Sequence, residues 1–311
     1  MRFSRSAHLS SIGSLAAPDS RALLWVEAAR PRTLVTAIVA VTVGTAAATA
    51  TARSLVGWRV AAAFVAALAI QVASNFANDY FDAARGVDSD ARIGPRRLTA
   101  SGLLSSHQMK VAVVVAVIVA TLPMLALSAA LGPVPITCWV AAVAAAILYS
   151  GGPRPVSSLP LGELLDFIFF GLFATAGAAY VHDGRVHLLA VAAAVPVGLL
   201  ASSMLLLNNL RDVDSDRAAG RRTLSVLLGR AASRTLLIVF LAGAFCWLAV
   251  ISLAAGQAGP LIALVALPLA IRTVRLVDEG MRSGSMARAF GSIAVLDLVF
   301  GLALALGLWH P

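Results

Sequence analysis

Nine stretches of mostly apolar residues, each about twenty residues long, occupy most of this chain and leave it few ways to fold. A helix of that length crosses a bilayer and satisfies all of its own backbone hydrogen bonds in lipid. The stretches are apolar on every side and lack the alternating pattern of a membrane β-barrel. We therefore predict an all-α polytopic membrane protein with nine transmembrane helices around a central cavity. The predicted spans are residues 33–52, 58–80, 109–131, 134–150, 161–181, 187–209, 236–255, 260–277 and 288–309.

Composition agrees with a membrane protein, since 59% of the 311 residues are hydrophobic and 13% are charged. The loops on the predicted outer face are too short to fold separately, so residues 23–311 are expected to form a single transmembrane domain. Residues 1–22 contain serine, arginine, proline and aspartate without a long apolar core, which does not fit a cleavable signal peptide. We expect them to form a flexible cytoplasmic tail.

The net charge of +9 is unevenly distributed along the chain. If the amino terminus and every second loop lie on one side, that side holds 21 of the 24 Lys and Arg residues, all except Arg53, Arg59 and Arg185. The positive-inside rule makes this side cytoplasmic, with the amino terminus inside and the carboxyl terminus outside. Membrane topology thus explains the basic residues, and no nucleic-acid partner is expected. The prediction is a multi-pass protein of the cytoplasmic membrane, in contact with the lipid bilayer.

Two short segments, residues 75–90 and 208–216, hold seven of the 15 carboxylates of the chain. Residues three and four apart share one face of a helix, so each segment places its polar groups in a stripe. The first stripe consists of Asn75, Asn78, Asp79 and Asp82, and the second of Asn208, Asp212 and Asp216. Both stripes lie at predicted cytoplasmic helix ends, and acidic groups so close to lipid usually have a function.

The oxygen atoms of these stripes suit magnesium, which binds one or two carboxylates together with substrate phosphate oxygens. Two such sites would bridge one diphosphate. Gly86 is able to end the first helix and let Asp88 and Asp90 fold back. Asp214 points away from the second stripe if the helix continues, and its role stays open. A solvated acidic loop neutralised by its own arginines would explain one such cluster more simply than it explains two.

Arginine residues crowd beside the same carboxylates. A guanidinium group matches phosphate oxygens with two parallel hydrogen bonds and is suited to holding a diphosphate. The candidates for substrate binding are Arg92, Arg96, Arg97, Arg217, Arg221 and Arg222. Metal and arginine together would stabilise the charge that builds up on a departing diphosphate. If the diphosphate leaves an allylic lipid carbon, the apolar bundle supplies the channel that a polyprenyl tail needs.

The two acidic segments also resemble each other. Residues 87–98 and 213–224 align without gaps and share Val-Asp-Ser-Asp, a glycine, an arginine and a leucine. Four predicted helices, an even number, separate them, which would make the halves parallel repeats about an axis along the membrane normal. Such repeats would direct both acidic segments into one shared central cavity.

Taken together, these motifs resemble those of the UbiA superfamily of intramembrane prenyltransferases. The resemblance rests on Asn78-Asp79-x-x-Asp82 and on Asn208-x-x-x-Asp212-x-x-x-Asp216. It is supported by Ala-Arg-Pro-Arg-Thr at 29–33, Ile-Gly-Pro-Arg at 93–96 and Tyr-Ser-Gly-Gly-Pro at 149–153. Within the superfamily the chain looks most like the subfamily that prenylates 1,4-dihydroxy-2-naphthoate.

The resemblance implies a magnesium-dependent enzyme that transfers a polyprenyl group from polyprenyl diphosphate to an aromatic acceptor. In this subfamily the acceptor is 1,4-dihydroxy-2-naphthoate, which loses its ring carboxylate, and the product serves menaquinone biosynthesis. The catalytic and metal-binding residues it implies are Asp79, Asp82, Asp212 and Asp216, with the third aspartate of the first motif displaced to Asp88. The substrate contacts it implies are Asn78, Asn208, Tyr149 and Arg154, where the last two stand for a Tyr-x-x-x-Lys-Arg element of the wider superfamily.

Three other acids and two rival functions remain open. Glu163 and Asp166 begin the fifth predicted helix, where acids suit the helix amino terminus, or they lie near the aromatic acceptor. Asp297 either hydrogen-bonds across the bundle or lines the cavity.

A CDP-alcohol phosphotransferase would need glycine where the chain has Ala83. An ion-coupled transporter is the alternative from another class, although its sites usually lie near the membrane midplane in broken helices.

Overall fold

The computed structural model describes residues 20–51, 55–86, 96–153 and 155–309. These residues form helices joined by short connections, and no strand occurs among them. The amino-terminal elements are α1 Arg21–Ala29, α2 Pro31–Thr49, α3 Gly57–Arg85, α4 Ser106–Leu131, α5 Val134–Ser150, η1 Val156–Ser158, α6 Gly162–Asp166 and η2 Phe167–Ala176. The remaining elements are α7 Gly177–Asp183, α8 Leu188–Arg211, α9 Val213–Ala218, α10 Leu224–Cys246, α11 Leu248–Ala255, η3 Gly259–Ala266, α12 Leu267–Ser283 and α13 Ala287–Leu308.

Eight helical stretches of the described chain are long and apolar enough to cross a membrane. Three of them are built from consecutive elements: α6 with η2 and α7, α10 with α11, and η3 with α12. The predicted span 134–150 coincides with α5, which has 17 residues and is therefore shorter than the others. Length and composition thus support eight of the nine predicted spans in a multi-pass membrane protein, and the ninth stays a prediction.

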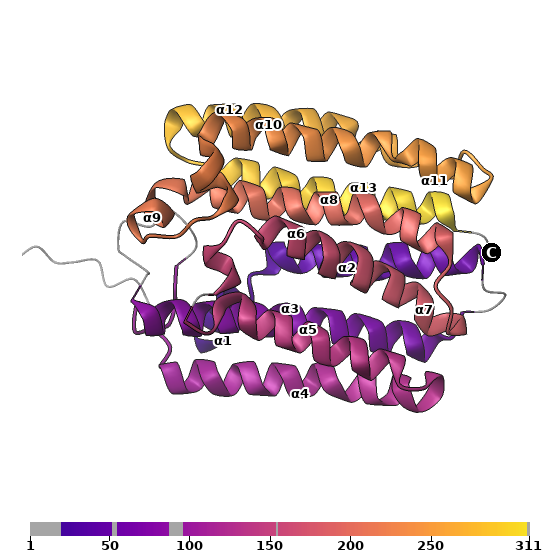
Figure 1. The fold of residues 1–311 in the computed structure, drawn as a ribbon, viewed down its shortest axis with the longest axis horizontal. Coiled ribbons are helices and arrows are strands. Elements are labelled where there is room, and N and C mark those ends of the chain that lie inside the picture. Colours follow the sequence, from indigo (N-terminus) through magenta and orange to yellow (C-terminus); the bar gives the residue numbers. More distant parts are fainter. Residues whose placement is uncertain (1–19, 52–54, 87–95, 154, 310–311) are drawn as a thin grey trace, which may run out of the picture.

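The helices lie side by side along the long axis of the molecule (Figure 1). α8 is central and packs against η2, α10 and α13, while α3 packs against α4, α2 and α5. The largest apolar core joins α2, α8 and the helices that follow α9. Figure 1 shows α1 and α9 at one end of the bundle and α7 and α11 towards the other. The carboxyl ends of α3 and α8, which carry the acidic segments, lie at the α1 and α9 end.

A short helix, α1, precedes the first long one. Ser20 caps it by accepting a hydrogen bond from the Leu23 N–H. Leu24 and Ala28 are buried against Phe76 of α3. The helix therefore begins inside the predicted tail of residues 1–22, most of which lies outside the described residues.

Glycine sets the end of the helix that carries the first acidic stripe. α3 ends at Gly86, whose φ of 64° lies in the left-handed region that favours glycine. The prediction that Gly86 ends this helix is therefore confirmed. The same helix continues past the predicted boundary at residue 80, so all four members of the first stripe lie within regular α-helix. The predicted positions of Asp88 and Asp90 lie outside the described residues.

A π-helix, η2, forms ten residues of the wall around the interior of the bundle. π-Helices are rare and often occur at functional sites. Close backbone contacts enclose this one from two sides. A Cβ atom on Gly171 would lie 2.7 Å from Cα of Gly198 in α8, and one on Gly44 of α2 would lie 2.1 Å from the carbonyl oxygen of Thr175. Glycine at these positions lets α2 and α8 approach η2 closely.

Gly44→Ala is expected to lower the free energy of unfolding by about 1–3 kcal/mol, or more if the helices cannot separate. The added methyl group would collide with a backbone carbonyl, which has less freedom to move than a side chain. Gly291→Ala in α13 is the matched control, because a Cβ atom there has no neighbour within 4 Å. Thermal unfolding in detergent measures both variants. Equal transition temperatures would show that the contact between α2 and η2 is not tight.

Candidate active site

Two buried aspartates lie one turn apart near the end of α3. Asp79 and Asp82 are each 3% exposed. The carboxylate of Asp79 accepts hydrogen bonds from the backbone N–H groups of Leu98, at 3.0 Å, and Thr99, at 2.9 Å. Asp79 therefore fixes the backbone of Leu98 and Thr99 against α3, and each of its carboxylate oxygens accepts one backbone N–H.

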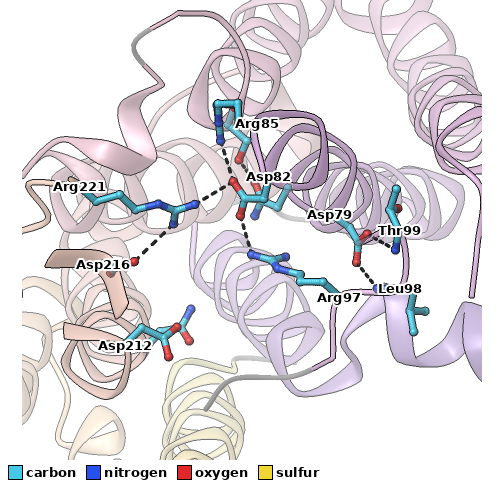
Figure 2. A network of polar contacts seen from close by, with 12 residues as sticks. Asp79, Asp82, Arg85, Arg97, Leu98, Thr99, Asp212, Asp216 and Arg221 are labelled. Atoms are coloured by element: carbon cyan, nitrogen blue, oxygen red, sulfur yellow. Dashed lines mark hydrogen bonds and ion pairs between the residues drawn. The ribbon is translucent and has the colours of Figure 1, made fainter. Parts of the chain in front are cut away.

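Three arginines converge on the carboxylate of Asp82 (Figure 2). Arg85 lies 2.6 Å away on the same helix, Arg97 lies 2.7 Å away, and Arg221 lies 3.0 Å away. Charge-assisted contacts of this length are among the strongest hydrogen bonds in proteins. One carboxylate thus faces three cations, and the remaining charge of these arginines is balanced by other carboxylates nearby, such as Asp216.

Arg221 joins the two acidic segments. Its guanidinium group lies 3.0 Å from Asp82 and 3.6 Å from Asp216, on opposite sides of the cluster (Figure 2). Asp82 and Asp216 come from helices that are far apart in sequence, α3 and α9. Arg221 thus joins one aspartate of each acidic segment in one cluster, while the shared central cavity expected from parallel repeats stays a prediction.

The second segment keeps its predicted spacing although the helix is interrupted. α8 ends at Arg211, and the short helix α9 follows Asp212. The N–H of Asp212 donates to the carbonyl of Asn208 at 3.1 Å, and the N–H of Asp216 donates to the carbonyl of Asp212 at 2.8 Å. Asp212 and Asp216 are buried, whereas Asp214 is exposed and points away, as predicted.

Arg211 holds the second segment together. Its Nε and Nη2 atoms each lie 2.7 Å from an oxygen of Asp212, and the same group donates to the side-chain oxygen of Asn208. Its guanidinium carbon lies 5.3 Å from the centre of the Phe290 ring, a contact expected for a cation over an aromatic face. Four arginines thus match four buried aspartates. The cluster consists of Asp79, Asp82, Asp212, Asp216, Arg85, Arg97, Arg211 and Arg221.

The end of α5 is hydrogen-bonded to the first acidic segment. Ser150 donates its hydroxyl to the side-chain oxygen of Asn78, and Arg85 donates to the backbone carbonyl of Ser150. The neighbouring Tyr149 is within electrostatic reach of Asp82 and Arg221. The predicted substrate contacts Asn78 and Tyr149 therefore lie beside the cluster.

The structure separates the predicted arginines into two groups. Arg97 and Arg221 belong to the cluster, whereas Arg96 pairs with Glu27 of α1 at 2.9 Å on an accessible surface. Arg217 is exposed and lies 3.7 Å from Asp214, outside the cluster. Arg222 is also exposed, and its backbone N–H donates to the carbonyl of Ser158. The predicted residues Asp88, Arg92 and Arg154 lie outside the described residues.

Sequence reasoning did not include Arg85 and Arg211 among the substrate-binding candidates. The signal for both is their position in the sequence. Arg85 lies three residues after Asp82, and residues three apart meet on a helix surface. Arg211 lies directly before Asp212, where α8 ends.

A largely apolar cavity of about 620 Å³ adjoins the cluster inside the bundle. Asn78, Tyr149 and Asn208, which belong to the polar end of the bundle, line it together with many apolar side chains. The aromatic part of the wall includes Trp139, Phe169, Phe170, Phe173 and Phe290. The prediction of a central cavity is confirmed, and its size is typical of sites for small organic ligands.

The arrangement has the features of a site for an amphiphilic anion. Charged groups that suit a phosphate head lie at the end of an apolar space that suits a hydrocarbon tail. Within the described ranges, no three His, Cys, Asp or Glu side chains are grouped so that they could hold a metal ion by themselves.

Comparison with known proteins identifies relatives along nearly the whole chain. A 1,4-dihydroxy-2-naphthoate octaprenyltransferase from Mycobacterium leprae is 36% identical over 281 residues, covering 90% of this chain and 94% of the relative. A protein of the same name from Escherichia coli is 33% identical and covers 93% of this chain and 97% of the relative.

Solved structures share the fold. A UbiA homolog from Aeropyrum pernix matches with a TM-score of 0.64 at 17% identity, covering 87% of this chain and 96% of that one. A UbiA homolog from Archaeoglobus fulgidus bound to GPP and Mg²⁺ matches with a TM-score of 0.60 at 19% identity, covering 90% and 99%. The model of the UbiA prenyltransferase family matches residues 37–307. The chain therefore belongs to the UbiA prenyltransferase family.

Proposed function

We propose that this protein transfers a polyprenyl group from polyprenyl diphosphate to 1,4-dihydroxy-2-naphthoate, with loss of the ring carboxylate, in menaquinone biosynthesis. The observation that carries the proposal is the cluster of four aspartates and four arginines at the end of a 620 Å³ apolar cavity. The names of the Mycobacterium and Escherichia relatives support the choice of acceptor.

The residues of the cluster fit magnesium. Asp79, Asp82, Asp212 and Asp216 offer hard oxygen ligands, which magnesium prefers, and they come in pairs from two helical segments. The four aspartates and four arginines balance in charge, so a diphosphate without cations would leave its own negative charge uncompensated. Bound magnesium would supply that missing positive charge and stabilise the departing diphosphate. The archaeal homolog bound to GPP and Mg²⁺ supports the same cofactor.

The arginines of the cluster would hold the diphosphate. Arg97 and Arg221 are 7% and 12% exposed at their side chains, so their contacts with an anion are little screened by water. Arg85 also contacts Asp82, and Arg211 contacts Asp212 of the second segment, so both would be positioned to bind the same ligand. Guanidinium groups that already point at this position stabilise negative charge as it develops on the leaving group without a large rearrangement.

The cavity would hold the lipid tail and the ring. When the bond from the allylic carbon to oxygen breaks, the electron pair stays with the diphosphate and the carbon becomes a delocalised cation. Aromatic side chains in the wall, such as Phe169 and Phe173, exclude water and stabilise a cation through their faces. The electron-rich ring carbon then forms the new carbon–carbon bond, and carbon dioxide leaves.

The distribution of Lys and Arg residues supports a cytoplasmic position for the cluster. Arg85 and Arg211 are the last residues of α3 and α8, and Arg97 and Arg221 contact Asp82 of α3. The positive-inside rule assigns this end of the bundle, where α1 and α9 lie (Figure 1), to the cytoplasm. The water-soluble diphosphate product would leave on that side. The protein would thus act at the cytoplasmic face of the cell membrane.

The decisive experiment incubates the purified protein in lipid nanodiscs with a labelled polyprenyl diphosphate and a panel of aromatic acids. We expect prenylated product and carbon dioxide with 1,4-dihydroxy-2-naphthoate, and preference for it over 4-hydroxybenzoate. Turnover with 4-hydroxybenzoate alone would instead identify another aromatic prenyltransferase of the same family. Ion flux in proteoliposomes without prenyl diphosphate would favour a transporter.

Removal of magnesium is expected to reduce product formation to background, because the cluster has no surplus positive charge for the diphosphate. Chelation with EDTA followed by addition of magnesium should restore the activity of the same sample. Product formation at the full rate in EDTA would contradict the metal requirement. Binding of the aromatic acid, measured separately, should persist in EDTA because it does not involve the diphosphate.

A further inference from the structure

The cavity contains one carboxylate that the proposed chemistry has not yet used. Among the described residues that line it, Asp166 is the only acidic side chain. No described residue forms a hydrogen bond or an ion pair with its carboxylate within the usual distances. An unpaired carboxylate in an apolar space is costly, and such groups inside membrane proteins usually have a function.

Asp166 lies at a distinctive point of the backbone. It is the last residue of α6, and the π-helix η2 begins at the next residue. It belongs to the same cavity wall as Tyr149 and Asn208, and its charge acts on the Tyr149 hydroxyl. Tyr149 is also within reach of Asp82 and Arg221. The residue therefore faces the space where a ring would meet a prenyl cation formed at the cluster.

Glu163, a neighbouring carboxylate in α6, has the contacts expected of an acid with a structural role. Glu163, one turn earlier, is 3% exposed and accepts a hydrogen bond from the side chain of Asn209 at 2.9 Å. Its backbone carbonyl accepts a hydrogen bond from Ser202 at 2.7 Å. Glu163 does not line the cavity. It joins α6 to α8, whereas Asp166 faces the ligand space without a protein partner.

We infer that Asp166 is the general base that accepts the hydroxyl proton of the aromatic acceptor, an inference that rests on the proposed function. The proton moves from the ring hydroxyl next to the carboxylate-bearing carbon to an oxygen of Asp166. The electron pair of the broken O–H bond then increases the electron density of that ring carbon. The carbon attacks the allylic cation, so a carbon–carbon bond forms while the diphosphate keeps the electron pair of the broken carbon–oxygen bond.

The later steps return the proton. After the attack, the ring carbon carries both the prenyl group and the carboxylate, next to a carbonyl group. A carboxylate in this position leaves as carbon dioxide, and its electron pair passes to the carbonyl oxygen. Protonated Asp166 then returns its proton to that oxygen, which restores the ring hydroxyl and the carboxylate of Asp166. No oxidant, reductant or further proton is needed.

Asp166→Asn tests this role, because asparagine has nearly the same size but cannot accept the proton. We expect the rate of naphthoate prenylation to fall about 10²- to 10⁴-fold. Binding of a non-ionising polyprenyl thiolodiphosphate should remain unchanged, since Asp166 is not part of the cluster. Asp278→Asn is the matched control, because Asp278 pairs with Arg234 outside the cavity lining, and its rate should stay within about threefold of the wild type.

Dependence on pH separates a base from a structural residue. In Asp166→Asn the acceptor can react only after its hydroxyl has ionised in solution, so the residual rate should rise about tenfold per unit of increasing pH. A structural defect would lower the whole profile without changing its shape. Asp166→Glu, which keeps a carboxylate, should recover most of the rate even if Asp166→Asn folds poorly.

The outcomes distinguish the inference from the proposed function. If the wild-type protein forms no prenylated naphthalene, the proposed function is wrong. If the wild type is active and Asp166→Asn matches Asp278→Asn, the role of Asp166 as a base is wrong. Loss of thiolodiphosphate binding in Asp166→Asn would also overturn it, because the residue would then act through the cluster.

Discussion

Asp212→Asn is expected to lower the rate of polyprenyl transfer about 10²- to 10³-fold. The substitution removes one negative charge from a buried side chain that is held by two contacts of 2.7 Å from Arg211. In the proposed site it also removes a magnesium ligand, so the charge on the departing diphosphate loses part of its stabilisation. Labelled product formed per minute at saturating substrates measures the effect.

Asp214→Asn is the matched control for this prediction. It is the same substitution two residues further along, but the side chain is 73% exposed and pairs with Arg217 and Arg230 at the surface. Exposed ion pairs contribute about 0–1 kcal/mol to stability, so activity and folding should both be preserved. Equal activity of the two variants would remove Asp212 from the proposed metal site.

Asp82→Ala is expected to abolish turnover and to lower the free energy of unfolding by about 3–5 kcal/mol. Three guanidinium groups would lose their shared acceptor, and the side chain of Arg97 is only 7% exposed. Leaving a buried cation without its partner is costly because water cannot replace the lost contact. Thermal unfolding in detergent and a product assay on the same preparation measure the two effects.

An ion pair elsewhere in the bundle provides the comparison. Asp278 of α12 pairs with Arg234 of α10, and their side chains are 28% and 33% exposed. Asp278→Ala should therefore cost less than about 1 kcal/mol and leave turnover intact. If both variants unfold at the same temperature, burial does not strengthen the contacts around Asp82 and the cluster is not a folding element.

The first acidic stripe could be predicted because helical periodicity is a local property. Asp79 and Asp82 are buried on one face of α3, whereas Ala84 is exposed on another. The outward direction of Asp214 followed from the same spacing. Hydrophobic length likewise predicted the spans, because a bilayer imposes one thickness on every helix that crosses it.

The partners of the arginines could not be predicted in this way. Arg96 and Arg97 are adjacent and chemically identical, yet one pairs with Glu27 and the other with Asp82. The difference arises because α1 packs against α3 and brings Glu27 within reach of Arg96. Which carboxylate an arginine pairs with depends on contacts between distant segments, and helical periodicity in the sequence gives no information on such contacts.

The position of Asp166 was also beyond local reasoning. An acid at the start of a helix is usually explained by the helix dipole, and the sequence left this explanation open beside a role near the acceptor. In the structure, α6, η2 and α7 form one continuous stretch, and Asp166 lies in the cavity wall. η2 also packs closely against Gly44 and Gly198, which belong to other helices.

The pairing of aspartates with arginines inside the cluster has a thermodynamic consequence for ligand binding. An arginine that turns from a carboxylate towards the diphosphate leaves that carboxylate available for magnesium. Each of the two ligands therefore frees a binding group for the other. Magnesium and diphosphate should then raise each other's affinity, and by linkage the factor must be the same in both directions. A site built on such reciprocity would bind neither ligand tightly alone, and it would release the diphosphate readily once magnesium departs.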